Sequence, residues 1–138
     1  MKIAGINKKN PINIIKNSSK ELKEISREFG KGIHLTLTDF KSLTSPKTFT
    51  NDGKFLSFKD LFLKILKKKI LKNEIIREIN AQLDFFEEAM GLNPDFIDGH
   101  HHVHQLPIIK DLIFEILKKR YKNNLPWIRN TYEENLKI

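Results

Sequence analysis

The sequence predicts an α/β fold in which parallel strands are covered by helices. Two observations predict this class. Short segments typical of strands alternate along the chain with amphipathic helices, which is the order expected of parallel sheets. The histidines lie on or directly after predicted strands, and functional sites of α/β folds gather at the carboxyl ends of strands. A chain of 138 residues is the size of one ordinary domain, so we expect residues 1–138 to form a single domain.

The first predicted element is a helix that begins at Ser18 and ends at Gly30. Ser18 with Glu21 three residues later has the spacing of a capping box, and glycine commonly ends a helix. A strand follows in GIHLTLT, residues 32–38, where aliphatic and polar residues alternate. The alternation places His34 on the polar face of this strand, opposite the aliphatic residues.

Two helices lie in the middle of the chain, after a long loop. The loop covers residues 39–56 and contains the turn-forming sequence NDG at residues 51–53. Ser57 begins the next helix, and a third helix runs from about Asn73 to Met90, before Gly91. Apolar residues recur in both helices at the spacing of a helix face, which indicates core packing. The residues of these faces are Phe58, Leu61, Phe62, Ile65, Leu66, Ile76, Ile79, Leu83, Phe86 and Met90.

The last three predicted elements surround the histidine cluster. PDFIDG, which begins at Pro94, predicts a short strand that ends at the histidines. Pro107 suits the first turn of a helix, and this helix continues to about Lys119. LPWIRN, residues 125–130, then predicts the start of another short strand.

The composition argues against several classes of function. The formal net charge is +8, but the lysines are scattered along helices without interleaved aromatic residues. Nucleic-acid binding needs clustered charge and stacking aromatics, so we expect no nucleic-acid partner. The absence of cysteine excludes disulfides, a thiolate zinc site and a cysteine nucleophile. No apolar run has the length of a signal peptide or a membrane span, so we expect a cytoplasmic protein without a membrane partner.

Four of the five histidines lie within FIDGHHHVHQLP, residues 96–107. Neutral imidazole is the commonest metal ligand, so this segment predicts a metal site. In an extended chain, one side of the segment would carry Asp98, His100, His102 and His104. In a helix, His100 and His104 would lie one turn apart on one face. Either conformation places these two histidines on the same side, and we expect His101 to point away from the site.

Two alternatives stay open for the residues around this cluster. A carboxylate such as Asp98 could bind a metal ion directly or orient an imidazole by accepting its N–H group. His34 could be a metal ligand or a hydrogen-bonded structural histidine. Two histidines and one carboxylate suit Zn²⁺ or another divalent ion, including Mg²⁺ if carboxylate and water dominate the coordination.

The same residues resemble a known family. GIHLTLT, followed further along by PDFIDGHHHVHQLP, resembles the YdjC-like carbohydrate deacetylases, which include chito-oligosaccharide and hopanoid-pathway deacetylases. Three further features are similar to the family. They are DGKF at residues 52–55, the helix that contains Gln82, and Arg129 after the last predicted strand.

The resemblance implies a metal-dependent hydrolase that removes acetyl groups from N-acetylated sugars, on an irregular (β/α) barrel-like fold. By motif, His34 matches the family's first metal histidine, His100 its second, and His104 a further histidine near the centre. A divalent ion, Mg²⁺ or Zn²⁺, would polarise the acetyl carbonyl and lower the pKa of bound water. The residues that we expect around the ion or the substrate are Asp98, His102 and Arg129.

The chain also departs from the family pattern. Family members begin with a strand that carries an aspartate pair, as in ADDFG, whereas residues 1–17 contain no Asp or Glu. We therefore expect an internal piece of the larger fold that lacks the first βα unit and the C-terminal third. Its unpaired sheet edges would favour a homo-oligomer. We expect weak or absent deacetylase activity, and the alternative is a non-catalytic metal- or sugar-binding remnant of such an enzyme.

Overall fold

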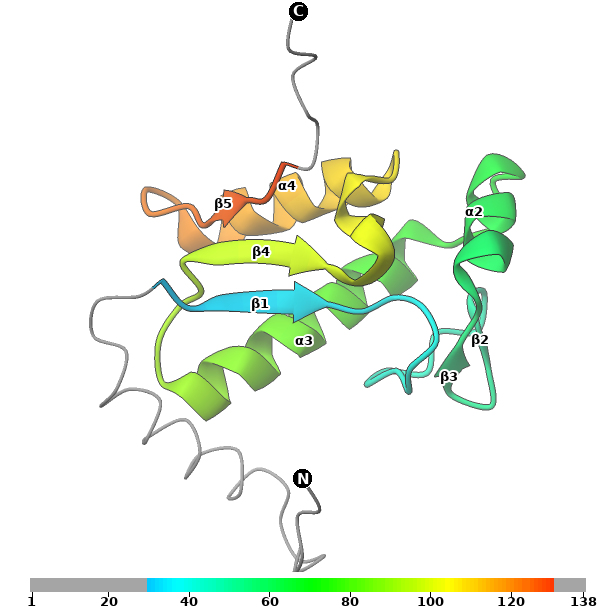
Figure 1. The fold of residues 1–138 in the computed structure, drawn as a ribbon, viewed down its shortest axis with the longest axis horizontal. Helices are drawn as coiled ribbons and strands as arrows, with labels where there is room; N and C mark the ends of the chain where they lie inside the picture. The colour runs from blue at the N-terminus through cyan, green and yellow to red at the C-terminus, as the bar shows by residue number, and fades with distance from the viewer. Residues whose placement is uncertain (1–29, 131–138) are drawn as a thin grey trace, which may run out of the picture.

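Three parallel strands form the central sheet of the molecule. The computed structural model describes residues 30–130. The strand order is β1-β4-β5, and both neighbouring pairs run parallel (Figure 1). The register pairs His34 of β1 with Asp98 of β4. The strand bounds are Gly32–Leu35 for β1, Phe96–Gly99 for β4 and Trp127–Ile128 for β5. The predicted α/β class with parallel strands is confirmed.

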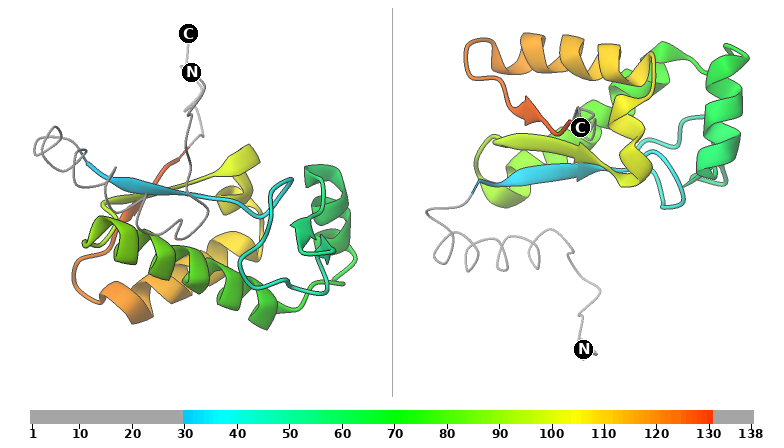
Figure 2. Two further views of the ribbon diagram at one scale, coloured as in Figure 1. Left: turned by 90° about the horizontal axis from the view of Figure 1, so that it is seen from below. Right: turned by 45° about the horizontal axis from the view of Figure 1, so that its top comes forward.

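Two helices cover one face of this sheet. Helix α3 spans Lys72–Met90 and helix α4 spans Ile109–Tyr121. Both lie on the same side of the strands, which leaves the opposite face without a covering helix in the described part of the chain (Figure 2). Side chains of the sheet and of both helices form one buried core. Its members on these elements include Ile33, Leu35, Ile97, Ile75, Ile79, Leu83, Ile109, Ile113 and Leu117.

The helix ends follow the residues that predict them. Ser57 caps α2 (Phe58–Leu66), since its hydroxyl oxygen accepts the backbone N–H of Asp60 at 3.2 Å. Gly91 ends α3 in the left-handed conformation, with a φ angle of 67°, which glycine adopts without steric cost. The predicted helix Ser18–Gly30 lies outside the described residues. Among the helices of residues 30–130, none is long and apolar enough to cross a membrane.

The segment 39–56 is not a plain loop, and that part of the prediction is wrong. It contains a short antiparallel hairpin, β2 (Thr50–Asn51) with β3 (Lys54–Phe55). Asp52 and Gly53 connect the two strands with φ angles of 48° and 75°, the pair of positive values that a tight two-residue hairpin turn requires. The NDG sequence indicates this turn, but strands of two residues are too short to show alternation.

Two glutamates of α3 anchor this segment to the body of the molecule. The carboxylate of Glu78 accepts hydrogen bonds from the backbone N–H groups of Leu43 and Thr44 at 3.0 and 2.9 Å. One turn earlier, Glu74 accepts those of Lys47 and Thr48 at 3.0 and 2.9 Å. Burial raises the pKa of Glu74, but the hydrogen bonds from Thr48 and Lys47 outweigh burial and hold this pKa below its ordinary value. Each buried carboxylate therefore replaces the backbone pairing that the segment lacks.

Candidate functional site

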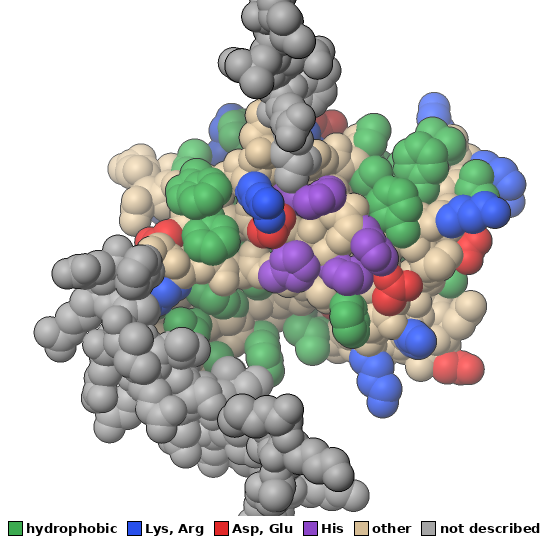
Figure 3. All heavy atoms as spheres, viewed as in Figure 1, with side chains coloured by type: hydrophobic (Ala, Val, Ile, Leu, Met, Phe, Trp, Pro, Cys, Tyr) green, Lys and Arg blue, Asp and Glu red, His purple; other side chains and the backbone are tan. Residues whose placement is uncertain are grey.

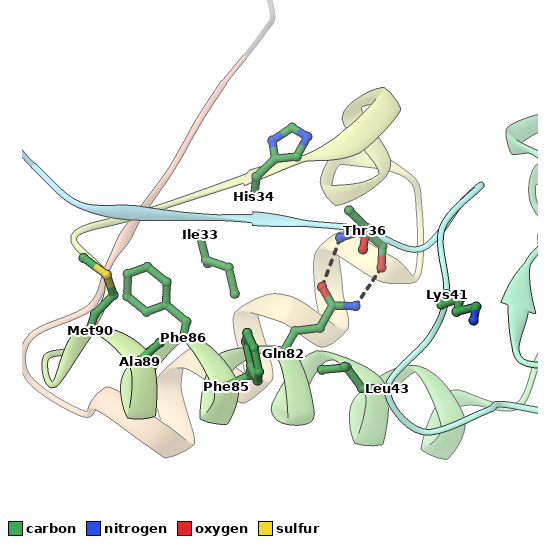
Figure 4. Close-up of a pocket in the computed structure, with 10 residues that line it drawn as sticks. All are labelled: Ile33, His34, Thr36, Lys41, Leu43, Gln82, Phe85, Phe86, Ala89 and Met90. Carbon is green, nitrogen blue, oxygen red and sulfur yellow. Dashed lines mark hydrogen bonds between the residues drawn. The ribbon is translucent and has the colours of Figure 1, made fainter. Parts of the chain in front are cut away.

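The candidate site lies at the carboxyl ends of β1 and β4. Histidine side chains gather at the centre of one face of the molecule, with acidic and basic side chains beside them (Figure 3). His34 of β1 points away from α3, whereas its neighbour Ile33 points toward that helix (Figure 4). The predicted polar face of β1 is therefore confirmed, and it is the open face of the sheet.

His34 and Asp98 are cross-strand neighbours at this edge. The Nδ1 atom of His34 lies 3.4 Å from Oδ2 of Asp98. The ring centroid of His34 also lies 5.8 Å from that of His100, with the two rings edge to face. One ring nitrogen of His34 therefore faces a carboxylate, and the ring itself borders a second imidazole.

Asp98 is held in place by two donors. Its Oδ1 accepts the backbone N–H of Gly99 at 2.8 Å, and its Oδ2 accepts Nη1 of Arg129 at 3.1 Å. Burial raises the pKa of Asp98, but the hydrogen bonds from Gly99 and Arg129 outweigh it and keep this pKa below its ordinary value. The backbone N–H of Arg129 donates to the carbonyl of Ile97, so the extension of β5 along β4 brings the guanidinium to Asp98.

The histidine segment is neither extended nor regularly helical. It forms the 3₁₀ element η1 (His100–Gln105), in which His101 and His102 have left-handed φ angles of 51° and 55°. Neither of the two predicted conformations is present, because two consecutive left-handed residues break both the two-residue and the 3.6-residue periodicity. Within residues 30–130, no group of three metal-capable side chains contains both His100 and His104.

Within the described residues, six metal-capable side chains form two groups of three, and His34 belongs to neither group. The first consists of Asp39, His100 and His101, and the second of Asp98, His102 and His104. In each group one ligand atom per residue lies within 4.8 Å of the others. Imidazole nitrogens and carboxylate oxygens at this separation are suited to a divalent ion.

His104 supplies a test of whether the second group fits an ion. Its side chain is fully buried, and its Nε2 lies 2.9 Å from the carbonyl oxygen of Arg129. Because a carbonyl only accepts, Nε2 carries the proton and Nδ1 of the neutral ring presents a lone pair. Nδ1 has no hydrogen-bond partner and lies 3.8 Å from Oδ1 of Asp98. Burial lowers the pKa of His104, which favours this neutral form. The lone pair of Nδ1 and the carboxylate of Asp98 repel each other, and a cation bound between them would remove this repulsion.

Comparison with known proteins identifies the family of this chain. A family model described as YdjC-like protein matches residues 10–137. The chain belongs to the YdjC-like family. The resemblance drawn from the two histidine motifs is therefore confirmed.

Relatives of this YdjC-like chain include proteins named as deacetylases. A chitooligosaccharide deacetylase from Proteus mirabilis (strain HI4320) is 32% identical over 106 residues, which cover 77% of this chain and 41% of the relative. A carbohydrate deacetylase from Brevibacillus brevis is 33% identical over 108 residues, 76% of this chain and 41% of the relative. The chain thus spans about two fifths of the length of these relatives.

A solved structure shares the fold. A protein from Enterococcus faecalis V583, provisionally described as a cellobiose-phosphate cleavage protein, superposes with a TM-score of 0.64 at 24% identity. The match covers 87% of this YdjC-like chain and 45% of the solved chain. The arrangement of strands and helices is therefore that of part of a larger α/β fold.

Sequence reasoning missed one acidic residue of the site, Asp39. Its Oδ2 lies 3.5 Å from Nε2 of His100 and 3.2 Å from Nδ1 of His101. The missed signal is its place directly after the GIHLTLT strand motif, at the same sheet edge as the histidines. His101 packs edge to face on Phe58, but it does not turn away from the cluster, since its ring centroid lies 4.1 Å from that of His100.

The other side of β1 holds an apolar cavity of about 310 Å³. It is lined largely by Ile33 and by Phe85, Phe86 and Met90 of α3 (Figure 4). Gln82 closes one end of it, because the side-chain amide donates to the carbonyl of Thr36 at 2.7 Å and accepts the N–H of the same residue at 3.0 Å. The cavity lies on the α3 side of β1, and His34 is among the residues that line it.

Proposed function

We propose that this chain is part of a metal-dependent deacetylase that removes acetyl groups from N-acetylated sugars. The observation that carries the proposal is the meeting of His34, Asp98 and His100 at the carboxyl ends of two parallel strands. The deacetylase names of relatives at 32% and 33% identity support the choice of substrate class.

The residues proposed to hold the ion are His34 and His100. Asp98 faces Nδ1 of His34, which leaves Nε2 of that ring free for a metal, and a carboxylate partner of this kind raises the basicity of a ligating imidazole. When bound, a divalent ion polarises the acetyl carbonyl and makes a water molecule acidic enough to attack it near neutral pH. His104 is proposed as a further ligand on the opposite side of Asp98, through its unpartnered Nδ1.

The polar residues around Asp98 provide a place for the sugar. A hollow of about 370 Å³ opens beside them, lined by His104, Gln105, Lys110 and Arg129 among others. A volume of this size suits a small ligand, and the side chains offer both donors and acceptors to hydroxyl groups. We propose that Arg129 and the exposed His102 contact the substrate, while Asp98 keeps Arg129 in position.

We further propose that the 138-residue polypeptide has little deacetylase activity by itself. Residues 1–17 contain no Asp or Glu, so they provide neither a carboxylate ligand nor a general base. A chain without these groups would bind the metal ion or the sugar but would not turn the substrate over. Acetate release from N-acetylglucosamine oligomers, with added Zn²⁺ or Mg²⁺, tests this point. Turnover on the order of 1 per second or more would show it to be wrong.

Metal binding tests the site itself, separately from turnover. We expect the wild-type chain to bind Zn²⁺ with measurable affinity, and His34→Ala and His100→Ala each to weaken binding at least about tenfold. Asp111→Asn, an exposed change in the first turn of α4, is the matched control and should bind as wild type does. Equal affinities in all four proteins would refute the assignment of His34 and His100.

A further inference from the structure

We propose that Asp39 and His101 bind the same ion as His100, so that these three side chains form an imidazole-rich site that prefers Zn²⁺ over Mg²⁺. The inference rests on the proposed function in one respect, because His100 belongs to both ligand sets. It adds two ligands, Asp39 and His101, that the sequence motifs do not indicate.

The separations between the ligand atoms carry the inference. Oδ2 of Asp39 lies 3.2 Å from Nδ1 of His101 and 3.5 Å from Nε2 of His100. Charge-assisted hydrogen bonds between such groups are shorter, at about 2.7–2.9 Å. Two ligand atoms that each lie about 2.0–2.1 Å from a tetrahedral ion are about 3.3 Å apart. Both distances are therefore close to the edge of a metal coordination shell, and the 3.5 Å separation is longer than a direct hydrogen bond of about 2.7–3.2 Å.

The three side chains are held in this arrangement by their surroundings. The ring of His100 packs edge to face on Phe40 with centroids 5.0 Å apart, and His101 packs on Phe58 in the same way at 6.0 Å. Oγ1 of the fully buried Thr38 lies 3.3 Å from Nδ1 of His101. The rings are thus positioned by packing, as a preorganised site requires.

The backbone at this group is also unusual. Asp39 and His101 both have left-handed φ angles, 66° and 51°. Residues other than glycine rarely adopt this conformation, and clusters of such residues occur at ligand-binding sites. The two turns bring a residue after β1 and a residue after β4 to one point, where an acid and two imidazoles meet. Both the backbone conformation and the side-chain types of this group are therefore those of a ligand-binding site.

The donor set selects the class of metal. Two imidazole nitrogens and one carboxylate suit Zn²⁺ or Co²⁺, whereas Mg²⁺ prefers an octahedral shell of oxygen atoms. Roughly half of the side-chain surface of Asp39 and of His101 is open to solvent, at 41% and 49%. The ion would therefore keep a position accessible to water or substrate, which is the property of a catalytic site.

Titration with Co²⁺, followed by its d–d absorption, tests the inference because the spectrum reports the ligands directly and needs no turnover. The variants are Asp39→Asn and His101→Asn, since asparagine tolerates the left-handed backbone of both positions. Asp52→Asn is the matched control, because Asp52 is an exposed aspartate with a φ angle of 48° in the β2–β3 turn. Competition with Zn²⁺ and Mg²⁺ gives the metal preference, and thermal melting of each metal-free variant confirms that it is folded.

We expect the spectrum of a four- or five-coordinate Co²⁺ ion, displaced by Zn²⁺ but not by an equal concentration of Mg²⁺. Asp39→Asn and His101→Asn should each weaken binding at least about tenfold, and Asp52→Asn should not. Wild-type affinity in both folded variants would overturn the inference, as would the absence of Co²⁺ binding by the wild-type chain.

His34→Gln separates the two proposals. If it weakens binding and the two Asn variants do not, the proposed function survives alone. If only the Asn variants weaken binding, Asp39 and His101 are ligands and His34 is not.

Discussion

Asp98 is the residue on which the geometry of the histidine face depends. It lies between His34 and His104, and it accepts hydrogen bonds from Arg129 and from the backbone of Gly99. Its pKa is held below the ordinary value by these donors, so the side chain is a carboxylate near neutral pH. A carboxylate in this place fixes which nitrogen of His34 is available to a ligand.

Asp98→Asn should therefore weaken Zn²⁺ binding although both proposed ligands, His34 and His100, remain in place. We expect a loss of about 10- to 100-fold in affinity, the range found when the carboxylate partner of a ligating histidine is removed. A fluorescence competition titration with a zinc chelator measures it, with Asp111→Asn as the control. An unchanged affinity would show that Asp98 does not act through His34.

At the residue scale, the sequence predicted the polar face of β1 but not the division of the other histidines into two groups. The alternation around His34 places its side chain correctly because a strand has a fixed two-residue period. His101 and His102 adopt left-handed conformations that no periodicity encodes, so the partners of His100 and His104 could not be predicted. Asp39 was missed because its carboxylate meets the histidines only when two loops converge in space.

Among the secondary-structure elements, α3 does more than cover the sheet. Its residues Glu74, Glu78 and Gln82 follow one another at one-turn intervals and bind the segment from Thr36 to Thr48. Glu78 is fully buried and also accepts Oγ1 of Thr44 at 2.5 Å. The segment that they hold carries Asp39, so this polar face of α3 helps to position the candidate site.

Glu78→Gln should destabilise the fold. The neutral amide presents an N–H group to donors that need an acceptor, and a buried hydrogen bond to a charged group contributes about 1.5–3 kcal/mol. We expect a decrease of about 2–3 kcal/mol in the free energy of unfolding, measured by urea denaturation. Glu115→Gln, an exposed change on α4, should alter it by less than about 0.5 kcal/mol. Equal stabilities of the two variants would argue against the anchoring role.

The contact between α3 and α4 should make stability depend on pH. Glu87 of α3 accepts hydrogen bonds from Arg120 and Tyr121 of α4. The hydrogen bond from Arg120 lowers the pKa of Glu87 below its ordinary value of 4.5, and it outweighs burial, which raises it. A lowered pKa in the folded state means that the stabilisation is present above 4.5 and is lost as the pH falls through the folded value.

Glu87→Gln should therefore be less stable than wild type at pH 7, by about 1 kcal/mol for a partly exposed pair. The difference should shrink as the pH falls below about 4.5, because the wild-type carboxylate then becomes protonated. Urea denaturation at pH 7 and at pH 3 measures both values. A difference that stays the same at the two pH values would show that the carboxylate charge is not the source of the stabilisation.

Helix and strand positions were largely predictable, whereas the polar contacts between elements were not. Capping at Ser57 and termination at Gly91 are local signals, and both are confirmed. Helix faces are recognised by their apolar residues, so Glu74 and Glu78 were not among the residues expected to pack. Only the structure shows that backbone N–H groups of a distant segment surround them.

The molecule as a whole is part of a larger fold type. Its three parallel strands and two covering helices match 45% of a solved chain, and its sequence matches 41% of the length of two deacetylases. The fold class was predictable because alternation of strands and helices leaves few arrangements other than a parallel sheet. The site forms at the carboxyl edge of that sheet, where the ends of β1 and β4 bring together residues far apart in the sequence.

The central claim is that this edge binds a divalent ion through His34 and His100. A crystal structure of the chain grown with Zn²⁺, with an anomalous difference map at the zinc absorption edge, tests it most directly. The account predicts a peak about 2.0–2.1 Å from one imidazole nitrogen of each of these histidines. A peak bound only by Asp98, His102 and His104, or no peak on the histidine face, would contradict it.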